Sequence, residues 1–185
     1  KVGAHPSFPD KLNFGRKIIN ISESDLYDSL CHQIQLFIQC CAELNVVMHH
    51  VKLHGALYNL AAKDADTAKV IIKALNSCCQ NTALYVPYQS VLAELAKDNF
   101  NIIYEAFADR RYHNNLQLVS RDREDAVITD AKLAWHHMES MIENNKVKTV
   151  EGECVAIKAD TFCVHGDQPH ALELVQYINR QLMTL

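Results

Sequence analysis

The chain has 185 residues and a formal net charge of -4 at pH 7, with 49% hydrophobic and 22% charged residues. These are ordinary values for a globular domain, which argues against disorder, and the length suffices for one buried core. No apolar run approaches the roughly 18 residues that a membrane-spanning helix needs. No stripe of Lys and Arg favours phosphate contacts, so neither a membrane nor a nucleic acid is an expected partner.

Strands and helices alternate along the predicted chain. Ser22 and Ser24 are candidates to cap the first helix, and Leu26, Leu30 and Ile34 recur behind them at helical spacing. In chain order, the expected elements are a strand at 1 to 4, a helix from Ser22 or Ser24 to Leu44, a strand at 46 to 51, a helix at 56 to 75, a strand at 82 to 86, a short helix at 91 to 97, a strand at 101 to 108, a long loop at 109 to 124, a helix at 128 to 144, an extended pair at 146 to 157, a strand at 161 to 164 and a helix at 171 to 182. Helices between strands require parallel pairing, so we expect an α/β fold in one domain over residues 1 to 185.

The cysteines indicate a reducing environment rather than a disulfide framework. There are seven of them, two pairs are adjacent in sequence at Cys40-Cys41 and Cys78-Cys79, and no CxxC occurs. In an apolar helix or strand a thiol behaves as a small hydrophobic group. A cytoplasmic location is therefore expected. The chain begins without Met and runs almost directly into a strand, so we expect a fragment of a longer domain.

Four clusters of ionisable residues each follow or close a short apolar segment. The clusters are residues 3 to 10, 51 to 59, 105 to 110 and 163 to 167. The carboxyl ends of parallel strands lie on one face of an α/β fold, and ligands bind there. We therefore expect His5, His54, Asp109 and His165 to meet in one shared site.

At these residues the sequence resembles the LamB/YcsF family. The matching segments, in order along the chain, are Gly3 to Asp10 followed by Phe14-Gly15-Arg16, His50 to Asn59, Phe107 to Arg110 with Tyr112, and Cys163 to Asp167. The resemblance implies an irregular (β/α) barrel of the glycoside hydrolase and polysaccharide deacetylase type. It also implies a barrel that is incomplete at its N-terminal side, because family members begin with further strands that carry Asn-Cys-Asp-Leu-Gly-Glu and His-Ala-Gly-Asp blocks.

The resemblance implies a role as the A subunit of the ATP-dependent 5-oxoprolinase, which opens the lactam of 5-oxoproline to L-glutamate together with subunits B and C. No Gly-x-x-x-x-Gly-Lys-Ser/Thr loop is present to bind phosphates. We therefore expect ATP to be consumed by the complex and held largely by the partner subunits, while this chain hydrolyses an activated lactam. Whether the chain also forms a homo-oligomer stays open.

Hydrolysis of a lactam needs a base for water, donors for the oxyanion, an acid for the leaving nitrogen and cations for the substrate carboxylate. The candidate catalytic residues are Lys52, His54, Glu105, Asp109, His165 and Asp167. The candidate substrate-binding residues are His5, Asp10, Arg16, Asn59 and Arg110. Most of them also have a structural interpretation: for example, Asp167 could cap the following helix, and Asp109 with Arg110 could form a salt-bridged turn.

Two other functions stay open. One is a metal-dependent amide hydrolase or carbohydrate deacetylase, with His5 and His54 as ligands of a divalent metal. The other is a noncatalytic subunit that organises its partners. Metal analysis would test the first, and site variants that keep full activity would favour the second.

Overall fold

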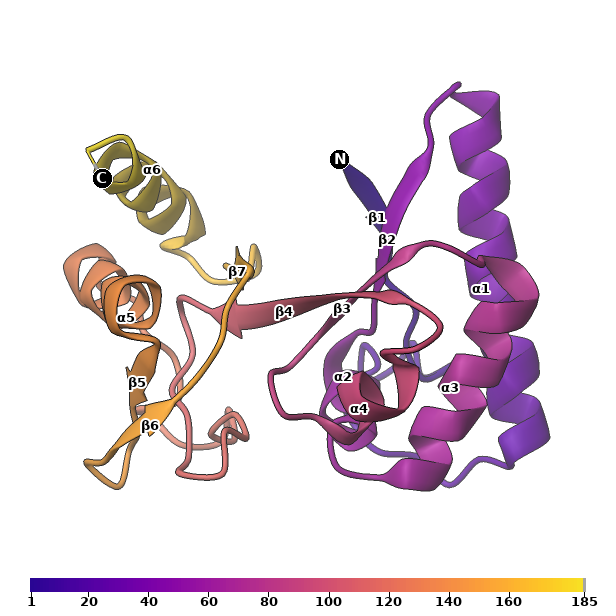
Figure 1. The fold of residues 1–185 in the computed structure, drawn as a ribbon, viewed down its shortest axis with the longest axis horizontal. Coiled ribbons are helices and arrows are strands. Elements are labelled where there is room, and N and C mark those ends of the chain that lie inside the picture. The colour runs from indigo at the N-terminus through magenta and orange to yellow at the C-terminus, as the bar shows by residue number, and fades with distance from the viewer. Residues whose placement is uncertain (185) are drawn as a thin grey trace. The chain divides into compact units, whose positions relative to one another are not determined.

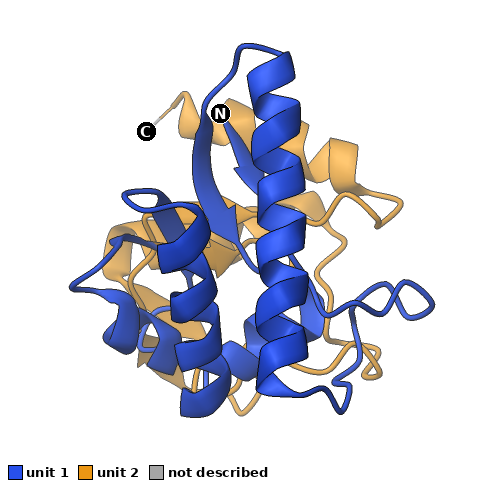
Figure 2. Cartoon of the chain, turned by 90° about the vertical axis from the view of Figure 1, so that its right-hand side faces the viewer, with its two compact units in different colours: residues 1–103 blue, residues 104–185 orange. Residues whose placement is uncertain are grey.

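The computed structural model describes residues 1–184. The chain divides into two compact units, Lys1–Ile103 and Tyr104–Leu185, which Figure 2 shows in different colours. The strand pairs β1 with β2, β2 with β3 and β4 with β7 are all parallel, so the predicted α/β class is confirmed. One barrel domain over the whole chain remains a prediction. Within residues 1–184, no helix combines the length and the apolar character needed to cross a membrane.

Unit 1 contains three parallel strands in the order β1-β2-β3, at Val2–Ala4, Met48–Lys52 and Ala83–Val86. The second strand begins two residues later than predicted, because Val47 is 87% exposed and lies outside the sheet. Gly3 pairs with His50, and a Cβ at Gly3 would collide with the His50 imidazole. Glycine thus allows β1 to approach a histidine that stacks on Tyr85 at 4.0 Å between ring centroids.

Two long helices cover unit 1, α1 at Glu23–Glu43 and α3 at Ala65–Cys78 (Figure 1). Ser22 caps α1 as predicted, because its hydroxyl accepts the backbone N–H of Asp25 at 3.1 Å. The two helices are linked by a hydrogen bond from Tyr27 Oη to Ser77 Oγ of 3.0 Å. Helix α4, at Val91–Ala96, is shorter and follows β3.

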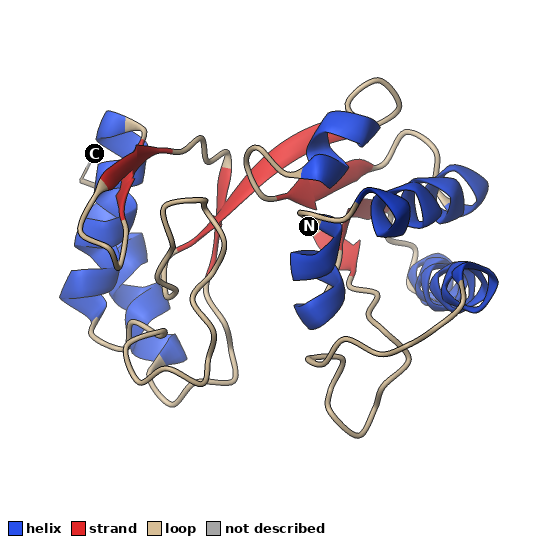
Figure 3. Cartoon of the chain, turned by 90° about the horizontal axis from the view of Figure 1, so that it is seen from below, coloured by secondary structure: helices blue, strands red, loops and turns tan. Residues whose placement is uncertain are grey.

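The predicted helix over residues 56 to 75 is wrong in one respect, because the chain forms two helices there. Helix α2 spans Gly55–Ala61, and α3 begins at Ala65 (Figure 3). Between them Asp64 has an extended backbone, and its carboxylate accepts the N–H of Thr67 at 2.8 Å. The alanine spacing continues across the break, so the apolar period could not reveal it, whereas Asp64 is a good helix cap.

Unit 2 is built on the parallel pair of β4, at Asn101–Phe107, and β7, at Thr161–Cys163, with Glu105 opposite Thr161. The first residues of β4 belong to unit 1 and the rest to unit 2. Strands β5, at Lys146–Lys148, and β6, at Cys154–Ala156, form a separate antiparallel pair, as predicted. Helix α6 spans Ala171–Leu182, as predicted, but α5 spans Ala131–Asn144 and begins later than expected because Asp130 caps it.

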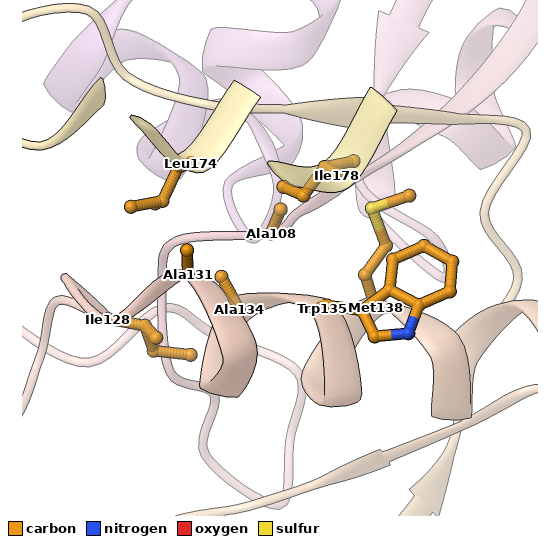
Figure 4. Packing of buried hydrophobic residues seen from close by; sticks show 8 residues of the cluster. All are labelled: Ala108, Ile128, Ala131, Ala134, Trp135, Met138, Leu174 and Ile178. Atoms are coloured by element: carbon orange, nitrogen blue, oxygen red, sulfur yellow. The ribbon is translucent and has the colours of Figure 1, made fainter. Parts of the chain in front are cut away.

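Helices α5 and α6 bury the apolar core of unit 2 between them (Figure 4). The cluster comprises Ala108, Ile128, Ala131, Ala134, Trp135, Met138, Leu174 and Ile178. Ile128 contributes to this core although it precedes the helix. Ala108, the residue that follows β4, belongs to this core, so the core packs against the carboxyl end of β4.

Candidate active site

Asp109 and His165 form the centre of the candidate site in unit 2. Asp109 follows β4 and is fully buried, and His165 follows β7. Because these strands are parallel and paired, their carboxyl ends are adjacent. His165 Nδ1 lies 2.9 Å from Asp109 Oδ1, and the His165 backbone N–H donates to Oδ2 at 2.8 Å. The pairing of strands thus brings together two residues that lie 56 positions apart.

Gln168 is a third donor to this carboxylate, and the sequence interpretation missed it. Its Nε2 donates to Asp109 Oδ2 at 2.8 Å, which fixes the orientation of its amide because the reverse orientation would set oxygen against oxygen. Its Oε1 is buried without a hydrogen-bond partner in residues 1–184. The available signal was weak, since Gln168 lies only three residues beyond His165 in a polar loop.

These contacts favour the ionised form of Asp109 and set the tautomer of His165. Burial opposes ionisation of Asp109, but the hydrogen bonds and charge of His165, aided by the charge of Arg110, keep the pKa of the carboxyl below its ordinary value. An ionised carboxylate requires an N–H at His165 Nδ1, so in a neutral ring Nε2 carries the lone pair. The Phe107 ring stacks on His165 at 5.3 Å, and the His165 side chain remains 24% exposed. The imidazole is therefore oriented, and its Nε2 can act as a base.

The other predicted residues of unit 2 have different surroundings. Glu105 is buried within β4, and Arg110 is buried and donates to the carbonyls of Val119 and Ala126, which hold the long loop after β4. Asp167 is exposed and lies 3.8 Å from Arg121. Asp167 does not cap α6, whose N-cap residue is His170.

In unit 1, His5 and His54 are in direct contact. His5 follows β1 and His54 precedes α2. His5 Nδ1 lies 2.7 Å from the carbonyl of Lys52, His54 Nε2 lies 2.8 Å from the carbonyl of Phe14, and His5 Nε2 lies 3.0 Å from His54 Nδ1. The rings meet edge to face at 4.8 Å.

The loop that follows His5 is closed around this pair. Gly55 has a φ of 57°, and a Cβ there would collide with the carbonyl oxygen of Gly15. That oxygen accepts the N–H of Ala56 at 3.0 Å. The Arg16 guanidinium lies 5.2 Å from the Phe14 ring centroid, and the Phe14 ring meets His54 edge to face. The glycines thus allow the close approach that places the Phe14 carbonyl against His54.

Two predicted substrate-binding residues of unit 1, Asp10 and Asn59, lie on the loop after β1 and on α2. The Asp10 carboxylate accepts two hydrogen bonds from the Asn13 side chain, at 2.8 and 3.1 Å, and shapes the loop. Asn59 lies exposed on α2. Lys52 contributes its backbone carbonyl to His5. The meeting of the two histidine pairs in one site remains a prediction.

The metal site predicted at His5 and His54 stays a prediction. The outer ring nitrogens, His5 Nδ1 and His54 Nε2, face backbone carbonyls, and the inner ring nitrogens face each other. No group of three or more His, Cys, Asp or Glu residues within residues 1–184 could hold a metal ion. We therefore derive no catalytic step through a metal.

His137 makes the stability of unit 2 sensitive to acid. Burial lowers the pKa of His137 from 6.5 to about 4, although the carbonyls of Arg110 and Phe107 oppose this shift. An unfolded chain binds this proton at the ordinary pKa, so the free energy of unfolding should fall by roughly 1–3 kcal/mol between pH 6.5 and pH 4. Urea unfolding followed by the fluorescence of Trp135, the single tryptophan, measures this change.

The matched variants are His137→Gln and His136→Gln, the second at the exposed neighbouring position on α5. The loss of stability in this pH range should shrink in His137→Gln and persist in His136→Gln. An equal pH dependence in both variants would contradict the assignment.

Comparisons with known proteins agree with the resemblance seen in the sequence. A protein from Bordetella pertussis, named as the A subunit of 5-oxoprolinase, is 40% identical over 182 residues, covering 98% of this chain and 72% of its own length. A protein of the same name from Staphylococcus aureus is 42% identical over 184 residues, with 98% and 73% covered. The crystal structure of the lactam utilization protein from Thermus thermophilus matches with a TM-score of 0.89 at 34% identity, covering 99% of this chain and 73% of that one. The family model of the LamB/YcsF family matches residues 1–184, and the chain therefore belongs to this family.

Proposed function

We propose that this chain is the hydrolytic subunit of an ATP-dependent 5-oxoprolinase, which opens the lactam of 5-oxoproline to L-glutamate. Relatives at about 40% identity are named as the A subunit of 5-oxoprolinase, and the solved relative is named a lactam utilization protein. The observation that supports the hydrolytic step is the Asp109–His165 pair. Its buried carboxylate orients the imidazole and leaves His165 Nε2 as a base.

In the proposed reaction, His165 Nε2 takes a proton from a water molecule whose oxygen attacks the lactam carbonyl carbon. Asp109 stabilises the imidazolium that forms, since its carboxylate already accepts the Nδ1–H. The C–N bond then breaks, and its electron pair stays on the nitrogen, which takes up a proton. We assign this donation to His54, an assignment that rests on the convergence predicted from the sequence.

Activation of the lactam is assigned to the partner subunits. An amide resists hydrolysis, and in the proposed reaction ATP phosphorylates the lactam oxygen. Opening of the C–N bond then leaves an acyl phosphate, which a second water molecule hydrolyses to the glutamate carboxylate and inorganic phosphate. The relatives are named as one lettered subunit of an enzyme, which supports an assembly of several subunits, and we propose that subunits B and C hold most of the ATP. Arg16 and Lys52 are proposed to bind the substrate carboxylate, for which an Arg fork is well suited.

Reconstitution tests this function. Subunits B and C are mixed with 5-oxoproline and ATP, with and without this chain, and L-glutamate is measured. Glutamate should form only when this chain is present. Formation of glutamate at the full rate by subunits B and C alone would overturn the proposal.

A further inference from the structure

The hydrogen bonds of the His5–His54 pair determine where its hydrogens lie. His5 Nδ1 is 2.7 Å from the Lys52 carbonyl oxygen, and His54 Nε2 is 2.8 Å from the Phe14 carbonyl oxygen. A carbonyl oxygen only accepts hydrogen bonds. Both outer nitrogens must therefore carry a hydrogen, and the tautomer of each neutral ring follows from its hydrogen-bond network.

The two inner nitrogens, His5 Nε2 and His54 Nδ1, then face each other without a hydrogen between them when both rings are neutral. A neutral imidazole carries a single N–H, so His54 Nδ1 and His5 Nε2 would both present lone pairs to each other at 3.0 Å. Two lone pairs repel at this distance, whereas a proton between them makes a charge-assisted hydrogen bond. We propose that the His5–His54 pair holds one extra proton between these nitrogens and carries a charge of +1.

The surrounding backbone stabilises this cation. Each ring donates to a carbonyl oxygen, and such bonds strengthen when the donor is charged. The acceptors are held in place, since Lys52 ends β2 and the loop around Phe14 is closed against α2 by the bond between Ala56 and Gly15. The Arg16 guanidinium lies over the Phe14 ring, and that ring in turn meets His54 edge to face.

The extra proton is the one that the leaving nitrogen takes up in the proposed function. This catalytic role of the histidine pair rests on that proposed function. As the C–N bond of the lactam breaks with its electron pair on nitrogen, the proton leaves the histidine pair and binds that nitrogen. The pair becomes neutral, and its inner nitrogens then repel each other. Release of the proton therefore loosens the contact that joins His5 to His54, and a new proton from solvent restores it.

Nitrogen NMR counts the hydrogens directly. The full chain is labelled with ¹⁵N at histidine, and the ring-nitrogen shifts and ring-proton couplings are recorded at neutral pH. The four ring nitrogens of His5 and His54 should share three hydrogens. His49 and His50 are a matched control, because their Nδ1 atoms also touch, at 3.2 Å, but no carbonyl in residues 1–184 fixes their tautomers. That pair should carry two hydrogens.

Two hydrogens on the His5–His54 pair would overturn the proposal. The count is made on the unmodified chain, so it does not depend on whether a variant folds. In His5→Ala the inner partner is absent, so His54 should keep one hydrogen, at Nε2. The hydrogen count does not depend on turnover, so it decides the shared proton even if 5-oxoproline is not the substrate.

The acid role is tested by the leaving group. His5→Ala should lower the turnover of 5-oxoproline by the reconstituted complex by about 10²-fold. The loss should be much smaller for the analogue in which a lactone oxygen replaces the lactam nitrogen, because an alkoxide leaves with less need of a proton than an amine. Equal losses with both substrates would contradict proton donation and leave His5 as a positioning residue.

Discussion

Replacing Asp109 by Asn is expected to lower kcat for glutamate formation by about 10³- to 10⁴-fold. The carboxylate of Asp109 accepts hydrogen bonds from His165 Nδ1, from the His165 backbone and from Gln168. An Asn amide can present only one oxygen, and its NH₂ group would face nitrogens that also donate. The imidazole would then favour the tautomer that places the hydrogen on Nε2, where the proposed base needs a lone pair.

The assay is glutamate formation by the reconstituted complex at saturating 5-oxoproline and ATP. The control is Asp125→Asn, which removes a carboxylate from an exposed ion pair with Arg123 of 2.8 Å and should leave kcat unchanged. Trp135 fluorescence verifies that the Asp109 variant is folded. Full activity of the Asp109 variant with intact assembly would favour the noncatalytic, organising function instead.

Combining Asp109→Asn with His5→Ala tests whether the Asp109–His165 pair and the His5–His54 pair serve one reaction. Residues that act as a unit in catalysis show strongly non-additive losses. We expect the double variant to lose less than the product of the two single losses. A fully multiplicative loss would contradict a shared catalytic unit.

Replacing Leu174 by Ala should destabilise unit 2 by about 3–5 kcal/mol. Leu174 is fully buried in the cluster between α5 and α6 (Figure 4). Removal of its isobutyl group loses the transfer free energy and leaves a cavity, since both helices are fixed by the rest of the core. This is a large part of the stability of a typical domain.

Urea unfolding followed by Trp135 fluorescence reports this loss, because the single tryptophan lies in the same cluster. The matched control is Leu172→Ala on the same helix, where the side chain is 70% exposed and the change should be within about 0.5 kcal/mol. Similar losses at both positions would show that the cluster is not the core of unit 2.

Local sequence was sufficient for most of the elements. Ser22 begins α1 because a serine hydroxyl can accept a free amide of the first turn, an interaction that spans three residues. The apolar spacing of Leu174 and Ile178 likewise predicted α6 with its observed bounds. The same reasoning failed at Asp64, where a cap interrupts a continuous apolar period and divides one predicted helix into two. Periodicity reports which face is buried, whereas a cap depends on a single side chain.

The amino-acid pattern alone identified the family and the polar residues at the ends of the strands, because these are properties of short segments. The partners of those residues depended on the folded chain. Strand pairing brings His165 to Asp109, and a loop closed through Gly15 and Gly55 sets a carbonyl against His54. Gln168 lies in no recognisable sequence motif, and its role as a hydrogen-bond donor to Asp109 follows only from the distance between the two side chains. Hydrogen bonds act over about 3 Å, so the chemistry of these groups was decided by tertiary contacts rather than by neighbours in sequence.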